Sequence, residues 1–183
     1  IAEQDSLAIK PETIAYDRNL NLTDLLFKYG LRINTDLVMD LRCDYIPIIV
    51  GGSMENPQMQ FLHWNYYPLL SSGENPITRN LGYVSSRFAN SIDTIAVKGV
   101  KKIPLLVSSP NSRVISTPAL ISLNENKNVP EDEKFKRNAI PAAMLLEGKF
   151  TSLYLNRIAQ SQLDSLRASG EEFKGLSGDN KMI

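Results

Sequence analysis

The sequence predicts an α/β domain with a mainly parallel sheet flanked by helices, in flavodoxin-like layers. Three observations support this prediction. Strand-like and helix-like segments alternate along the chain, several strand-like runs are apolar at every position, and 183 residues suit one domain. We therefore treat residues 1–183 as a single α/β domain.

Two segments have the periodicity of amphipathic helices. The first opens near Asn21, a residue type that caps helices, has Asp24 in its first turn, and ends at Gly30. The second is predicted over residues 75–92, with Asn75 as the cap and Pro76 at the first helical position. Its apolar face follows helical spacing for four turns.

Short apolar runs predict the strands. The predicted strands are residues 37–39, 45–50, 59–67, 103–107 and 142–146. Residues 124–138 are expected to form a surface excursion, residues 150–167 to be partly helical, and residues 169–180 to be loop.

The ends of the sequence suggest a fragment of a longer protein. The chain starts at Ile1, and a strand is predicted to start at Lys181 and stop at Ile183. The longest apolar runs fall far short of the roughly 20 residues of a membrane span. We therefore expect any membrane anchor to lie outside this chain.

Charge composition argues against two classes of partner. Lys and Arg number 20 and Asp and Glu number 20, so the formal net charge is zero. A nucleic-acid-binding domain needs a basic face, and a polybasic membrane patch needs clustered cations. Neither nucleic acid nor direct membrane contact is expected, and no cofactor is predicted.

Two polar segments are candidates for ligand binding. A predicted helix start with a nearby arginine can hold an anion, and a polar loop after the apolar strand 103–107 could join it at the carboxyl edge of a parallel sheet. The candidate residues are Asn75, Thr78, Arg79, Ser108, Ser109 and Asn111. A helix cap and a polar turn explain the same residues without a ligand, and this simpler interpretation is favoured.

No motif for catalysis is complete. Cys43 is the only cysteine and His63 the only histidine, and no glycine flanks Cys43 to form a nucleophile elbow. Gly148 and Lys149 resemble the end of a phosphate-binding loop, but they follow a strand-like run. Aromatic residues in 61–67 could stack on a sugar or peptide, although a core role is favoured. The chain is predicted not to be an enzyme and to hold no metal.

Four segments together resemble a known family. They are residues 21–34, 75–78, 104–112 and 145–152, in the same order along the chain. They are similar to gliding-motility-associated auxiliary components of ABC transporters in Bacteroidetes-type bacteria, which belong to a wider auxiliary-domain family.

The resemblance implies a location, partners and a fold. Such proteins are membrane-anchored, with the folded part on the periplasmic side of the inner membrane, and they work with an ATPase subunit and a permease subunit. The implied fold is similar to glutamine-amidotransferase-like α/β domains without the catalytic cysteine elbow. Such proteins are often described as substrate-binding, but the resemblance carries over no ligand-binding residue.

Four functions stay open on the sequence alone. The leading one is a non-catalytic accessory domain of an ABC transporter that acts by binding or subunit contact. The others are a solute- or glycan-binding module, a hydrolase or amidotransferase relative using Cys43 and His63, and a structural interaction domain in a motility or secretion assembly.

Overall fold

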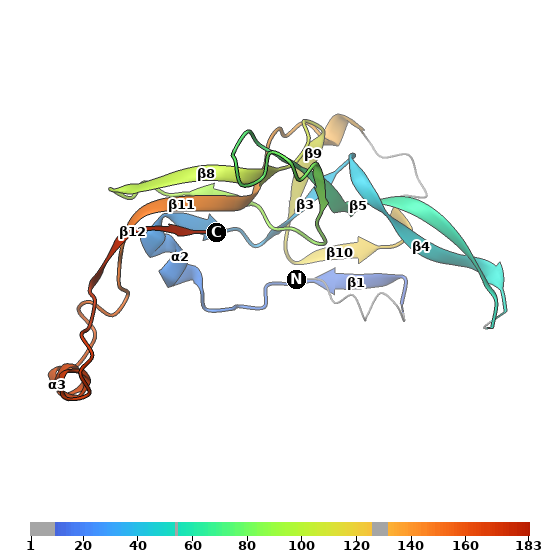
Figure 1. Ribbon diagram of the computed structural model, residues 1–183. Helices are drawn as coiled ribbons and strands as arrows, with labels where there is room; N and C mark the ends of the chain where they lie inside the picture. The colour runs from blue at the N-terminus through green and yellow to red at the C-terminus, as the bar shows by residue number, and fades with distance from the viewer. Residues whose placement is uncertain (1–9, 54, 126–131) are drawn as a thin grey trace.

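The computed structural model describes residues 10–53, 55–125 and 132–183 (Figure 1). Every strand pairing in these residues is antiparallel. The predicted parallel, flavodoxin-like or glutamine-amidotransferase-like sheet is therefore wrong. A parallel sheet needs crossover helices, and the described residues contain only the short α-helices α2 (Thr23–Tyr29) and α3 (Gln160–Ala168).

The main sheet has six strands. Its order is β12 (Leu176–Met182), β11 (Pro141–Thr151), β8 (Val100–Val107), β5 (Pro57–Ser72) and β4 (Cys43–Gly52), with β6 (Tyr83–Ser85) also pairing with β5. Only two residue pairs, Ser71 with Val107 and Ser72 with Leu106, join β5 to β8. This narrow junction separates the sheet into two parts.

Three two-stranded ribbons complete the β-structure. They are β1 (Glu12–Ala15) with β10 (Ala119–Ser122), β2 (Leu31–Ile33) with β7 (Ile92–Thr94), and β3 (Asp36–Asp40) with β9 (Ser112–Ser116). A two-stranded ribbon is marginally stable alone, so each ribbon depends on side-chain packing against the rest of the molecule.

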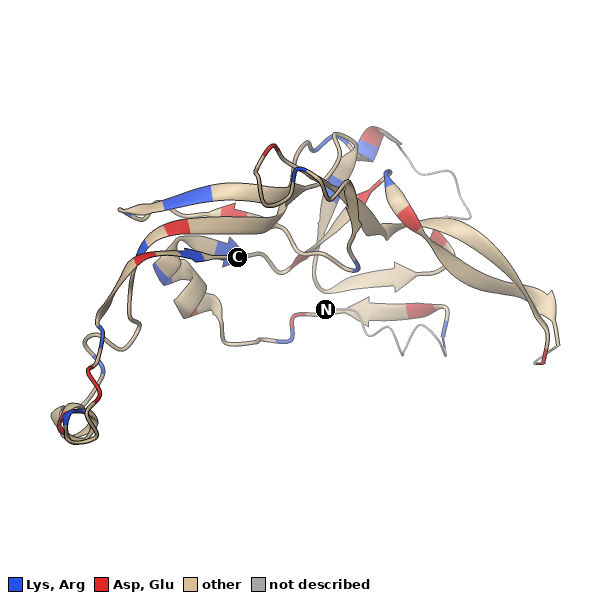
Figure 2. Cartoon of the chain, viewed as in Figure 1, with Lys and Arg blue, Asp and Glu red and all other residues tan. Residues whose placement is uncertain are grey.

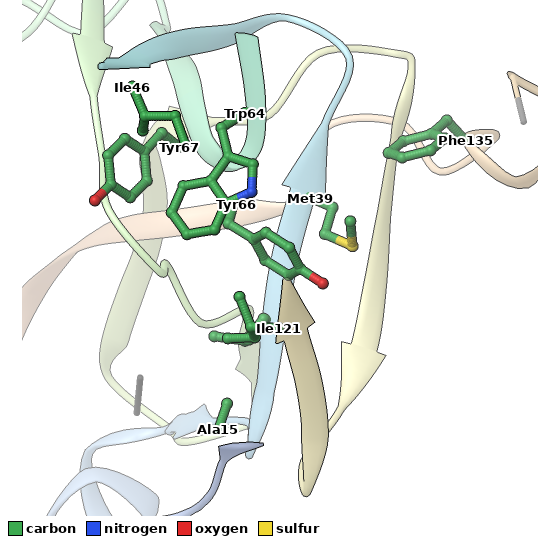
Figure 3. Close-up of a cluster of buried hydrophobic side chains, with 9 residues drawn as sticks. Ala15, Met39, Ile46, Trp64, Tyr66, Tyr67, Ile121 and Phe135 are labelled. Carbon is green, nitrogen blue, oxygen red and sulfur yellow. The ribbon is translucent and has the colours of Figure 1, made fainter. Parts of the chain in front are cut away.

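The larger hydrophobic core is built on aromatic side chains from residues 64–67 of β5 (Figure 3). Trp64 packs edge-to-face on Tyr66 and Tyr67, with ring centroids 5.3 and 5.0 Å away. Met39 of β3 and Ile121 of β10 belong to the same core, so two of the ribbons pack against these aromatic side chains. A second, smaller core joins Leu31 to β11 through Met144, Leu146 and Phe150.

The first predicted helix is confirmed as α2, which covers Thr23–Tyr29. Gly30 ends it in the left-handed conformation, with φ of 90°. A Cβ atom there would lie 2.8 Å from the Ile95 carbonyl oxygen, so only glycine fits. The cap prediction is wrong, because Leu22 occupies the N-cap without a side-chain bond and Asn21 itself has φ of 56°.

The second predicted helix, residues 75–92, is wrong. The segment forms a turn, then β6, and then the start of β7. Gly82 and Phe88 have positive φ values of 66° and 54°, which an α-helix cannot contain. Val84 of β6 pairs with Leu70 of β5. The apolar residues at helical spacing therefore lie in a short strand and in the loops around it.

The C-terminal segment agrees only in part with the sequence prediction. Residues 150–167 are partly helical as predicted, because α3 covers Gln160–Ala168. The predicted loop at 169–180 is wrong from Leu176 onward, because β12 pairs there with β11. The segment 132–134 is a short 3₁₀-helix, η2 (Asp132–Lys134), and residues 126–131 of the predicted excursion lie outside the described residues.

Two projections leave the body of the molecule at opposite ends (Figure 1). One is the hairpin of β4 and β5, and the other carries α3 between β11 and β12. The hairpin is named the arm below. The core aromatics lie at its base, and its distal half extends away from the body.

Candidate functional site

The predicted residues Ser108, Ser109 and Asn111 form a turn after β8, in which the two serines are buried and Asn111 is exposed. The Ser109 backbone N–H donates to Asp40 Oδ2 at 2.7 Å, and the Ser109 hydroxyl donates to Asp40 Oδ1. Ser108 Oγ lies 2.7 Å from Ser112 Oγ and accepts a bond from the Ile140 N–H at 2.9 Å. These bonds hold the end of β8 against β3, so both serine side chains already have partners inside the protein.

The predicted residues Asn75, Thr78 and Arg79 share one tight turn. Asn75 Oδ1 accepts from the Ile77 N–H at 2.9 Å, and the Asn75 carbonyl accepts from the N–H groups of Thr78 and Arg79. The Thr78 side chain is buried, and its hydroxyl has no partner among the described atoms. Arg79 is exposed.

Sheet topology leads the two candidate segments away from each other. In the antiparallel junction, β5 continues beyond Ser72 in the direction of Pro104, whereas β8 continues beyond Val107 in the direction of Leu70. No hydrogen bond among the described residues joins the two segments. A shared ligand role for these six residues stays a prediction.

Cys43 and His63 lie on neighbouring strands, but the thiol is not activated. Cys43 Sγ is buried and lies 3.5 Å from Asn65 Oδ1. Burial, reinforced by the charge of Asp40, raises the pKa of the Cys43 thiol to about 11, so the thiol stays protonated at neutral pH. His63 Nδ1 lies 3.2 Å from the Cys43 carbonyl oxygen. This arrangement does not supply a thiolate nucleophile.

The described residues bring together neither a metal-binding group nor the phosphate-binding loop that Gly148 and Lys149 resembled. No group of three or more His, Cys, Asp or Glu side chains is placed there to hold a metal ion. Gly148 and Lys149 lie inside β11, paired with Asn180 and Asp179 of β12, so they do not form a phosphate-binding loop.

The arm exposes a continuous apolar face. Three successive cross-strand pairs, Tyr45 with His63, Pro47 with Phe61, and Ile49 with Met59, lie on one side of the ribbon. All six side chains are exposed, including Phe61 at 64% and Ile49 at 65%. We name this surface the arm face: Tyr45, Pro47, Ile49, Met59, Phe61 and His63.

The opposite side of the arm explains why its conformation is fixed. Ile46 is buried in the larger core and Ile48 packs against that core. On the arm face, the Tyr45 and His63 rings stack with centroids 4.0 Å apart. The strands are therefore anchored from one side, while the arm face stays open.

Charge is nearly absent from the arm (Figure 2). Between residues 45 and 62, Glu55 near the tip is the only charged side chain in the sequence. Asp44 lies at the base, where the Ser85 hydroxyl donates to it and lowers its pKa. An uncharged, exposed face of this kind is typical of a protein contact surface.

The edge of β4 favours contact through side chains over strand addition. β4 is the last strand of its sheet in the described part of the chain, so its outer edge has no strand partner there. Pro47 removes one N–H donor from this strand, a feature that discourages pairing with another strand. Partner contact is therefore expected on the arm face.

Sequence reasoning missed the arm face. The core role predicted for the aromatic residues of 61–67 is confirmed for Trp64, Tyr66 and Tyr67 but wrong for Phe61, which is exposed. The missing information was the register between β4 and β5, which brings the two halves of the face together. The alternation of exposed residues along both strands was the available signal.

Three clefts lie away from the arm, around α2 and the segment that follows β11. The first has a volume of about 190 Å³ and includes Leu22 and Arg32 in its lining. The second has about 580 Å³ and lies between α2 and residues 151–157, and the third has about 690 Å³ and lies beside α3. None of them is lined by the six predicted binding residues.

The helices of the described residues do not reach across a bilayer. None of them combines the length and the apolar character that a membrane span requires.

Comparison with known proteins identifies the family. A search of curated proteins and a search of solved structures each give no significant match. The family model described as an ABC-type uncharacterized transport system matches residues 1–183, which is the whole chain. The chain therefore belongs to this family of auxiliary components of ABC-type transport systems.

Proposed function

We propose that the chain is a non-catalytic, extracytoplasmic accessory domain of an ABC transporter that contacts another subunit through the arm face. In this proposal the domain lies on the periplasmic side of the inner membrane, anchored by segments outside this chain. Its partners are the permease and the ATPase, and the transporter is of the gliding-motility type to which the protein GldG belongs.

The arm face is the observation that carries the proposal. Its three cross-strand pairs are exposed, and Glu55 is the only charge in the surrounding segment. Exposed aromatic and aliphatic groups gain free energy when a partner covers them, because their apolar surface is removed from water. The raised pKa of the Cys43 thiol fits a role without nucleophilic catalysis.

Copurification from native membranes tests this proposal. The full-length protein is compared with a double variant, Ile49→Ser with Phe61→Ser, which removes two of the most exposed apolar groups of the arm face. A hot-spot residue at the centre of an interface contributes about 2 kcal/mol or more, so we expect at least about a tenfold loss of recovered permease and ATPase.

The matched control changes an equally exposed apolar pair elsewhere. Ile14 and Leu120 are register partners in β1 and β10, with exposures of 58% and 60%. An Ile14→Ser, Leu120→Ser variant is expected to retain both partners. Equal recovery of the transporter with the arm variant, or no association of the unmodified protein, would overturn the proposal.

A structural role in a motility or secretion assembly is the second candidate. It uses the same arm face, but its partner is a component of that assembly. Mass spectrometry of the copurified proteins separates the two roles. The structural role is supported if the protein that the arm variant fails to recover is a component of that assembly and not the permease.

A further inference from the structure

The second cleft lies at the opposite end of the molecule from the arm tip. It separates α2 from the segment that follows β11, and its volume is about 580 Å³ (Figure 1). This volume is within the range of roughly 300–1,000 Å³ that small-ligand sites occupy. The cleft is independent of the proposed subunit contact.

An aromatic ring and aliphatic groups form its apolar part. Phe27 on α2 lines the cleft and is 56% exposed, with Leu153 and Leu155 contributed by the segment after β11. An exposed aromatic ring beside polar side chains offers a face against which the C–H groups of a saturated ring can pack.

Two cations give the cleft its charge. Lys28 Nζ donates to the Ser152 carbonyl at 2.6 Å, which fixes the ammonium group beside the cleft. The Arg157 side chain has no hydrogen bond or ion pair with any described residue, so its planar guanidinium is available to a ligand carboxylate. Asp24 is the only acidic group in the lining, which leaves one net positive charge.

The remaining polar groups suit hydroxyls. Asp24 accepts hydrogen bonds, Asn156 both donates and accepts, and Thr23 and Thr151 offer hydroxyl groups. Their side chains have no hydrogen-bond partner among the residues that the structure describes. A ligand with several hydroxyls and one negative charge satisfies this set.

We propose that this cleft binds an acidic sugar, a pyranose ring that carries one carboxylate. The carboxylate pairs with Arg157, the ring packs on Phe27, and the hydroxyls bond to Asp24 and Asn156. A free monosaccharide and the end of a glycan chain present the same chemistry. A neutral sugar leaves Arg157 without a carboxylate, and a multiply charged phosphate meets only two cations.

Titration of the 183-residue protein with sodium glucuronate tests the proposal. Binding is followed by calorimetry and by the amide NMR signals of α2 and residues 151–157. A dissociation constant of about 1 mM is expected for a ligand of this size. Glucose is expected to bind at least about tenfold more weakly, and Arg157→Gln and Phe27→Ala each to weaken glucuronate binding by a similar factor.

Lys136→Gln is the charge-matched control, because Lys136 is exposed and does not line the cleft. It is expected to leave glucuronate affinity unchanged, as is the Ile49→Ser, Phe61→Ser arm variant. The proposal is overturned if glucuronate shows no saturable binding at 20 mM, a limit about twentyfold above the expected constant. It is also overturned if glucose binds equally well or if Lys136→Gln weakens binding as much as Arg157→Gln. A glucuronate oligomer then distinguishes the two sources of the ligand. An oligomer that binds more tightly than glucuronate indicates the end of a glycan chain, and an oligomer that binds equally indicates a free monosaccharide.

Discussion

Residues 57–63 and 64–72 of β5 both contain aromatic and aliphatic side chains, but the two parts lie in opposite environments. In residues 64–72, Trp64, Tyr66 and Tyr67 are buried and belong to the larger core. In residues 57–63, Met59 and Phe61 are exposed on the arm face. Hydrophobicity alone therefore does not determine burial here. The other ribbons and loops cover the second part, while the first part extends beyond them (Figure 1).

Removing the central core ring is expected to have the largest effect. Trp64 is 1% exposed and contacts Tyr66, Tyr67 and Phe88, and its indole N–H donates to the Ser122 carbonyl at 3.2 Å. Trp64→Ala should lower the free energy of unfolding by about 3–5 kcal/mol, measured by urea denaturation with circular dichroism. Trp64→Phe should cost clearly less, and an equal or negligible cost for both variants would contradict the assigned core.

Cys43, which begins β4 opposite Pro68 of β5, should make stability depend on alkaline pH. Burial first, and then the charge of Asp40, raise the pKa of Cys43 from an ordinary 9.0 to about 11. As pH rises, the thiol therefore loses its proton in the unfolded chain before it does so in the folded chain. The contribution of the thiol to the free energy of unfolding is complete below pH 9 and is lost as pH rises to 11. A pKa difference of this size corresponds to roughly 2–3 kcal/mol.

The measurement is urea unfolding at pH 8 and pH 11 under reducing conditions. Other groups titrate in this window, so Cys43→Ala is the reference. The unmodified protein should lose more free energy of unfolding between these pH values than Cys43→Ala does. Identical pH profiles would show that the thiol titrates alike in the folded and unfolded chain.

Strand positions were predictable because they depend on local sequence. The runs at 37–39, 45–50, 59–67, 103–107 and 142–146 all lie within strands of the structure. Their direction was not predictable from the same signal. Apolar runs suggested strands buried on both faces, yet Ile49 and Val50 are exposed. Antiparallel pairing depends on contacts between segments distant in sequence, such as Leu146 with Lys102.

The candidate binding residues show a similar limit. A polar turn after residues 103–107 was predicted, but its main acceptor, Asp40, is 69 positions from Ser109. The helix predicted from Asn75 failed because helical spacing at Ile77 and Leu81 occurs in a segment where both residues are exposed. Local periodicity cannot report such long-range partners.

The smallest effect on stability is expected on the arm face, where the consequence for association is largest. Phe61 is 64% exposed and its register partner is Pro47, so Phe61→Ser removes little buried area. Its free energy of unfolding should stay within about 0.5 kcal/mol of the unmodified protein. The same variant should recover less transporter from native membranes, whereas Leu120→Ser, at 60% exposure, should change neither quantity. A cost of several kcal/mol for Phe61→Ser would instead place Phe61 in the core with Trp64. Unchanged stability together with lost association is the combination that separates a surface held open for a partner from one that completes the fold.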